Sequence, residues 1–132
     1  MNIHKFFYLT IQGENLDIAK AQNLIKLPCK IFRKGEIILK NINSKTYAHT
    51  PQKTNRWLYS AEDISDISSE DFLLNQLEIL IEHLAELQNY IESGMAELEL
   101  NLYAENATDF RFSTEHISKL SQLGLGVSLS FC

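Results

Sequence analysis

The chain has 132 residues, of which 45% are hydrophobic and 22% charged, close to the averages of globular proteins and to the length of one domain. A chain of this size can bury a core that needs neither disulfide bridges nor metal ions, so we expect one domain over residues 1–132. The net charge of −5 and the isoelectric point of about 5.3 argue against a module that is basic throughout, and no apolar run approaches the ~18 residues of a membrane helix.

The cysteines and the N-terminus bear on metal content and compartment. Cys29 and Cys132 are the only cysteines, and without a CxxC pair or a nearby histidine pair they form neither a zinc nor a redox motif. The apolar N-terminal stretch is interrupted by Thr10 and Gln12, and no small-residue cleavage site follows it. We therefore expect no cofactor, no metal, no contact with a membrane and a cytoplasmic location.

The first element in chain order is a strand over residues 6–12, because β-forming residues alternate there until Gly13. A helix capped by Asn15 or Asp17 follows, and Pro28 stops it. Its expected apolar face consists of Ile18, Ala21, Leu24 and Ile25.

The next stretch has a weaker pattern. Residues 30–43 are predicted to be extended, with a break at Gly35. Residues 44–55 are polar and predict a loop. Residues 56–60 predict a short strand around Trp57, the only tryptophan.

A long amphipathic helix of about 24 residues is the strongest single prediction. Ser68 with Asp71 resembles a capping box at its start, and Gly94 closes it. Its apolar residues recur at spacings of 4, 3, 4, 3 and 4: Leu73, Leu77, Leu80, Leu84, Leu87 and Ile91. This seam is typical of a helix packed on a core, and a homodimer through the seam or through the C-terminal strand stays open.

The C-terminal part predicts two strands around a short helix. Residues 96–103 alternate leucines with polar residues, which is typical of a half-solvated strand. A helix begins at Ser113 or Thr114 and ends at Gly124, and residues 126–132 form the last strand. The residues expected to face inward on this helix are Ile117, Leu120 and Leu123.

The elements follow the order β-α-β-β-α-β-α-β. Short strands, two of them half polar, with helices between them favour an α+β fold. We expect a single, mainly antiparallel sheet of about five strands with the helices packed on one face.

Five segments spread along the chain carry a family resemblance. They are residues 7–16 (FYLTIQGENL), 24–28 (LIKLP), 34–36 (KGE), 56–59 (RWLY) and 120–124 (LSQLG). Together they resemble the bacterial family catalogued as domain of unknown function 4279. The chain differs from similar sequences at its end, where residues 128–132 replace an acidic-aromatic strand. The resemblance implies an α+β fold and a bacterial origin, and it implies no activity.

The charge is distributed unevenly along the chain. Residues 1–58 carry ten Lys/Arg and three Asp/Glu, a net charge of +7, whereas residues 59–132 carry two and fourteen, a net charge of −12. Such asymmetry arises when the two halves attract each other, or when one of them faces a charged partner.

The leading functional hypothesis rests on carboxylates. Glu78, Glu82 and Glu86 follow one another at i, i+4 and i+8, a spacing that destabilises a helix by about 0.2–0.5 kcal/mol per pair unless a cation compensates. With Glu97 and Glu99 they form a candidate partner-binding surface. We expect a non-catalytic bacterial protein-binding domain, of the immunity or antitoxin type, that neutralises a basic toxin domain.

Two alternatives belong to other classes. Cations and rings within residues 26–56 have the composition of a single-stranded nucleic-acid surface, although the acidic isoelectric point disfavours nucleic acid as the partner. The residues of that surface are Lys30, Arg33, Lys34, Lys40, Tyr47 and Arg56. The other alternative is a small-molecule sensor or an enzyme with a pocket between residues 44–55 and 104–113. No nucleophile elbow, phosphate-binding loop or dinucleotide fingerprint is present, so we expect no enzyme.

Overall fold

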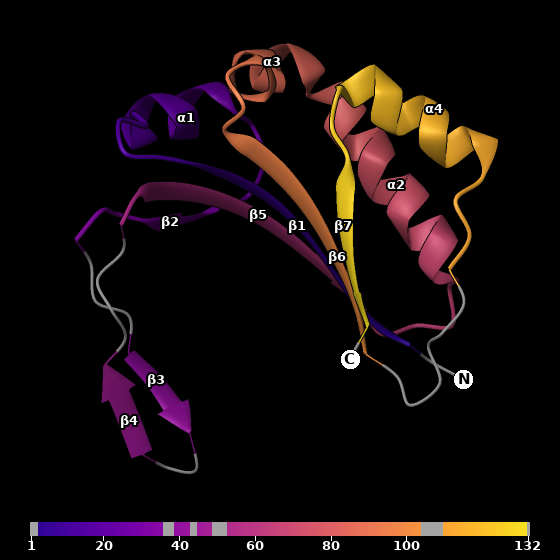
Figure 1. Ribbon diagram of the computed structural model, residues 1–132, viewed down its shortest axis with the longest axis horizontal. Coiled ribbons are helices and arrows are strands. Elements are labelled where there is room, and N and C mark those ends of the chain that lie inside the picture. The colour runs from indigo at the N-terminus through magenta and orange to yellow at the C-terminus, as the bar shows by residue number, and fades with distance from the viewer. Residues whose placement is uncertain (1–2, 36–38, 43–44, 49–52, 104–109, 132) are drawn as a thin grey trace.

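The computed structural model describes residues 3–35, 39–42, 45–48, 53–103 and 110–131 (Figure 1). Five strands form one sheet in the order β2-β5-β1-β6-β7, and each neighbouring pair is antiparallel except the parallel pair β6–β7. Their bounds are β1 (His4–Gly13), β2 (Lys30–Phe32), β5 (Asn55–Asp63), β6 (Ala96–Tyr103) and β7 (Val127–Phe131).

The helices cover one face of this sheet, as Figure 1 shows. They are α1 (Ile18–Leu24), α2 (Ser69–Glu82), α3 (Leu84–Glu92) and α4 (Thr114–Leu123). The predicted α+β class, the mainly antiparallel five-stranded sheet and the one-sided helical layer are confirmed. We call the sheet face opposite the helices the open face.

The core lies between the sheet and the helices. Alternate residues of the three central strands are buried there: Phe7, Leu9, Ile11, Trp57, Tyr59, Ala96, Leu98, Leu100 and Leu102. Each fully buried large apolar side chain contributes about 1.5–3 kcal/mol relative to exposure. Because strand residues alternate between faces, their neighbours in sequence point to the open face.

The leucine seam packs into this core. Leu73, Leu77, Leu80 and Leu87 are at most 1% exposed, and Leu84 and Ile91 are partly buried against them. The prediction of one continuous helix was wrong, because the chain breaks at His83, whose backbone has φ −103° and ψ 16°. The break turns α3 away from α2 (Figure 1), so that both helices pack on a curved sheet.

Other element boundaries also differ from the prediction. The first helix ends at Leu24, well before Pro28, and the Leu24 side chain is 40% exposed. In α4, Ile117 is 60% exposed, and the inward positions belong to His116, Leu120 and Leu123. His116 is tolerated in the core because its Nε2 lies 2.9 Å from the Glu70 carbonyl oxygen and its Nδ1 accepts the Ser113 backbone N–H at 3.0 Å.

The predicted loop over residues 44–55 contains a strand. β4 (Lys45–Ala48) pairs antiparallel with β3 (Leu39–Ile42), forming a two-stranded ribbon separate from the main sheet. Hydropathy did not indicate this strand, since the alternating apolar signal comes from packing against a core. The predicted strand over residues 56–60 is extended in the structure to the nine residues of β5.

Three predicted helix starts are confirmed by their caps. Asp17, Ser68 and Ser113 each accept a hydrogen bond from the backbone N–H three residues later. Such caps contribute about 1 kcal/mol each.

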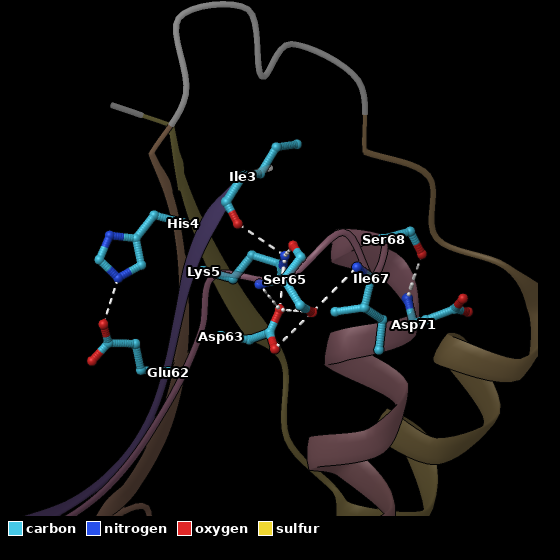
Figure 2. Close-up of polar contacts among 9 residues, drawn as sticks. All are labelled: Ile3, His4, Lys5, Glu62, Asp63, Ser65, Ile67, Ser68 and Asp71. Carbon is cyan, nitrogen blue, oxygen red and sulfur yellow. Dashed lines mark hydrogen bonds and ion pairs between the residues drawn. The ribbon is translucent and has the colours of Figure 1, made fainter. Parts of the chain in front are cut away.

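A buried lysine lies at the end of the sheet nearest the start of α2 (Figure 2). The Lys5 side chain is fully buried, and its Nζ donates to the carbonyl oxygens of Ile3 and Ser65 at 2.9 and 3.0 Å. The Asp63 Oδ2 lies 3.0 Å from the same Nζ, and this hydrogen bond lowers the pKa of Asp63. All three donors of the ammonium therefore have acceptors.

Candidate functional site

The three helix glutamates are not an uninterrupted acidic row. Glu86 Oε1 accepts the backbone N–H of Lys26 at 2.6 Å, and its Oε2 lies 2.7 Å from His83 Nδ1. The hydrogen bond from Lys26, followed by that from His83, lowers the pKa of the Glu86 carboxyl. Glu86 thus ties the end of α1 to the start of α3 and is only partly exposed.

The other two helix glutamates differ from each other. Glu78 forms an ion pair with Lys119 of α4, at 3.3 Å. Glu82 is exposed and makes no hydrogen bond or ion pair with the residues that the structure describes. Compensation within the chain therefore accounts for two of the three carboxylates.

Glu97 and Glu99 lie on the other side of the molecule. They alternate in β6 with the buried Leu98 and Leu100, so their side chains point to the open face. Both are exposed and, within the described part of the chain, make no hydrogen bond or ion pair. The five predicted partner-binding residues thus do not converge: three lie in the helical layer and two lie on the open face.

Aromatic side chains gather beside Glu99 on the open face. The rings of Phe6 and Tyr8 are parallel within 2°, with centroids 6.3 Å apart. Tyr103 meets Phe6 edge-on at 5.4 Å, and the His4 ring lies 4.3 Å from Phe6. We call Phe6, Tyr8 and Tyr103 the aromatic cluster.

Carboxylates flank the aromatic cluster from both neighbouring strands. Glu99 of β6 is the cross-strand partner of Tyr8, and Glu62 of β5 is that of Phe6. Burial raises the pKa of the Tyr8 hydroxyl, and the nearby Tyr103, Glu99 and Glu62 raise it further. Two carboxylates therefore lie close enough to this hydroxyl to disfavour a further negative charge there.

Asn101 completes the surroundings of the aromatic cluster. It lies in β6 as the cross-strand partner of Phe6, two residues from Glu99. Its Oδ1 is buried and receives no hydrogen bond from the residues that the structure describes. Such acceptors are rare in folded proteins and mark positions that are not optimised for stability.

The predicted nucleic-acid residues are divided between the sheet and the ribbon. Lys30 and Arg56 lie on the open face at the β2–β5 edge, and the Arg56 guanidinium lies 4.4 Å from the Phe32 ring centroid. Lys40 and Tyr47 are cross-strand partners in the ribbon.

The remaining two residues of that set follow β2. Arg33 and Lys34 are both exposed, and the backbone N–H of Lys34 donates to Asn55 Oδ1 at 2.7 Å. Among the residues of this set whose side chains the structure describes, Lys30 and Arg56 share the open face with the aromatic cluster.

Two hollows are lined by described residues, and neither is lined by residues of the predicted pocket. One, of about 160 Å³, lies beside Cys29 and Lys30, and the other, of about 190 Å³, lies between α1 and α3 near Tyr90. The predicted pocket involves residues 49–52 and 104–109, which lie outside the described residues.

The described ranges contain neither a cluster of metal ligands nor a helix that could span a membrane. These ranges hold no group of three or more His, Cys, Asp or Glu side chains able to bind a metal ion. No helix among the same residues has the length and apolarity to cross a bilayer.

The aromatic cluster was not predicted, although the sequence carries a signal for it. The alternation of residues 6–12 predicts a strand, with Phe6 and Tyr8 on one of its sides. A strand with large apolar residues on both sides, in a sheet whose helices cover one face, exposes one of those sides.

The comparisons with known proteins agree with the sequence resemblance. A family model described as "Domain of unknown function (DUF4279)" matches residues 2–131. No curated protein and no solved structure matches the chain. Since the family model covers nearly every residue, the chain belongs to the DUF4279 family.

Proposed function

We propose that this domain is a non-catalytic protein-binding module that docks a basic protein on its open face. Its action would be that of an immunity or antitoxin-type protein, which covers a basic toxin domain. The observation that carries the proposal is the aromatic cluster beside the exposed carboxylate of Glu99, with the exposed Glu97 two residues away on the same face of β6. The surface differs from the one that the glutamate spacing predicted, because Glu78 and Glu86 are engaged within the chain.

The chemistry of the open face suits a protein partner. Aromatic side chains are enriched at protein interfaces, where they supply large contact areas at a low cost in conformational entropy. Tyr8 and Phe6 are already half-buried and ordered by each other, so docking immobilises little more of them.

The exposed carboxylates determine the sign of the charge that a partner surface must carry. Glu97 and Glu99 lie next to the rings without a cation of their own in the described part of the chain. Charges placed around an interface accelerate association with a partner of opposite charge and reject one of like charge. A basic protein can place cations against both the aromatic rings and the carboxylates.

The test is a pull-down from source cells with the tagged chain and two charge-reversed variants. The double variant Glu97→Lys/Glu99→Lys alters the open face, and the control variant Glu82→Lys alters an exposed helix glutamate. We expect one stoichiometric basic partner, bound by the wild type and the control and weakened by about tenfold or more in the double variant. Circular dichroism checks that all three chains fold alike.

Two outcomes contradict the proposal. A partner that is lost with Glu82→Lys but kept by the double variant would move the interface to the helices. Unchanged affinity in both variants would remove the carboxylates from recognition altogether.

A second candidate, nucleic-acid binding, is favoured by one observation. Arg56 stacks on Phe32 beside Lys30, which is a pairing suited to bases and phosphates. Glu97 lies on the same face in the same cross-strand row as Lys30, with Leu58 and Thr10 between them. Its carboxylate repels phosphate, which disfavours this candidate. Fluorescence anisotropy with a labelled single-stranded RNA decides: tight binding that weakens steeply with salt and is lost in Arg56→Glu would replace the protein-binding proposal.

A further inference from the structure

We infer that the aromatic cluster seats one arginine side chain of the partner, stacked on the ring of Tyr8 and paired with Glu99. This inference rests on the proposed function, and it names the chemical group that the open face recognises.

The rings provide the stacking surface. Tyr8 lies on the open face with its ring parallel to that of Phe6, whose other ring neighbours are His4 at 4.3 Å and Tyr103 edge-on at 5.4 Å. Tyr8 is therefore the ring of the cluster that remains for a ligand. A cation over an aromatic face is attracted by the ring quadrupole when it lies within about 6 Å of the centroid. Guanidinium groups stack on such faces more often than ammonium groups do.

The charges around the rings select a cation. Glu99 and Glu62 approach from β6 and β5, one on each side of β1. Glu62 is already engaged by His4, whose Nε2 lies 2.6 Å from Oε1. Glu99 has no such contact with the described residues, so it is the carboxylate that remains for a ligand.

The planar shape of the seat favours arginine over lysine. A guanidinium carries five N–H donors in a planar fork, so one group can stack on a ring and pair with the Glu99 carboxylate at the same time. An ammonium lacks the flat shape that stacking requires.

The same face already contains one pairing of this kind. The guanidinium of Arg56 lies 4.4 Å from the centroid of the Phe32 ring. The proposed seat repeats that contact at the centre of the sheet, with an arginine supplied by the partner.

The experiment uses three blocked tripeptides, Gly-X-Gly, in which X is arginine, lysine or citrulline, the neutral isostere of arginine. Each is titrated into the ¹⁵N-labelled full chain and followed by NMR. We expect the arginine peptide to shift the amides around Tyr8 and Glu99 and to bind about fivefold or more tightly than the citrulline peptide. The lysine peptide should bind more weakly than the arginine peptide.

Matched variants assign the contact. Glu99→Gln should weaken arginine binding by about threefold or more, whereas Glu82→Gln on the helical side should leave it unchanged. Equal binding of arginine and citrulline, shifts that map elsewhere, or no saturable shift at all would overturn the inference.

The two proposals fail in different ways. A protein partner that is lost in Glu97→Lys/Glu99→Lys, with no arginine preference among the peptides, would leave the proposed function standing and remove the arginine seat. An arginine preference at Tyr8 with no protein partner on the open face would keep the arginine seat and remove the proposed function.

Discussion

Lys5 shows how a single buried charge can be accommodated in this fold. Its ammonium has the Asp63 carboxylate and two backbone carbonyls as acceptors, and its side chain is fully buried (Figure 2). The contacts join the start of β1 to the chain that leads from β5 into α2. Sequence analysis gave no sign of this role, because a lysine in a strand is most often exposed.

Truncation of this side chain should be strongly destabilising. We expect Lys5→Ala to lower the free energy of unfolding by about 2–4 kcal/mol, since it removes the packed stem and the counter-charge together. The control His4→Ala, which breaks the exposed contact with Glu62, should cost about 1 kcal/mol or less. Urea denaturation at pH 7 measures both free energies. Equal effects of the two variants would mean that the buried contacts of Lys5 contribute no more to stability than the exposed contact of His4.

Asn101 should tolerate an apolar replacement. Replacing it by valine removes a buried acceptor that lacks a donor among the described residues and places a β-branched residue in a strand. We expect Asn101→Val to keep or raise the free energy of unfolding, by up to about 1 kcal/mol, in urea denaturation at pH 7. A large loss of stability would show that Oδ1 has a structural partner.

At the scale of elements, Glu86 fastens α1 to α3. The pKa of its carboxyl lies below the ordinary value of 4.5, chiefly because the Lys26 N–H donates to it. A group with a lowered folded-state pKa stabilises the fold above its unfolded-state pKa, and this contribution is lost as pH falls through the folded-state value.

We therefore expect the free energy of unfolding of Glu86→Gln to depend less on pH in the acid range than that of the wild type. The variant should be less stable than the wild type at pH 7, and the difference should shrink as the pH falls below the ordinary carboxyl pKa of 4.5. Urea midpoints at pH 7, 5, 4 and 3 measure it, with Glu82→Gln as the exposed control. If the difference stays constant with pH, the hydrogen bond to Lys26 does not depend on the charge of Glu86.

The element pattern shows what the sequence can predict. Strand β6 matches the predicted range 96–103 from end to end, because apolar and polar residues alternate there without exception. Ser68 and Gly94 are likewise confirmed as the start and the end of the helical stretch. These features are encoded locally, in periodicity and in caps.

The features that were missed depend on contacts between distant parts of the chain. The leucine spacing continues through His83, so nothing local indicates that the helix breaks there to follow the sheet. The division of the five glutamates between two sides of the molecule follows from which face the helices cover. Glu86 is engaged by Lys26, sixty residues away in sequence, and no spacing rule could have paired them.

At the scale of the whole molecule, the basic and acidic halves of the chain are interleaved. Strand β1 from the first half lies between β5 and β6. The contacts Lys5–Asp63 and His4–Glu62, and the hydrogen bond from the Lys26 backbone N–H to Glu86, join the two halves. Apart from the buried Lys5, these contacts involve exposed or partly exposed groups. The attraction between the halves is thus distributed over a few contacts, and most of the acidic excess faces solvent.

This arrangement predicts that salt affects binding far more than folding. Between about 0.1 M and 1 M NaCl the Debye length falls from ~10 Å to ~3 Å. Exposed ion pairs contribute about 1 kcal/mol or less, and screening also relieves the repulsion among the excess carboxylates, so the melting temperature should change by less than about 4 °C. Affinity for a basic partner should fall by about tenfold or more over the same range, because association depends on the unscreened field of the open face.

Calorimetry and partner titration at the two salt concentrations measure the two quantities. A melting temperature that drops steeply with salt would mean that the two charged halves hold the fold together. The opposite charges of the two halves would then neutralise each other within the chain, and few carboxylates would remain to attract a partner. A stable fold with salt-sensitive binding would assign the surplus of carboxylates to recognition.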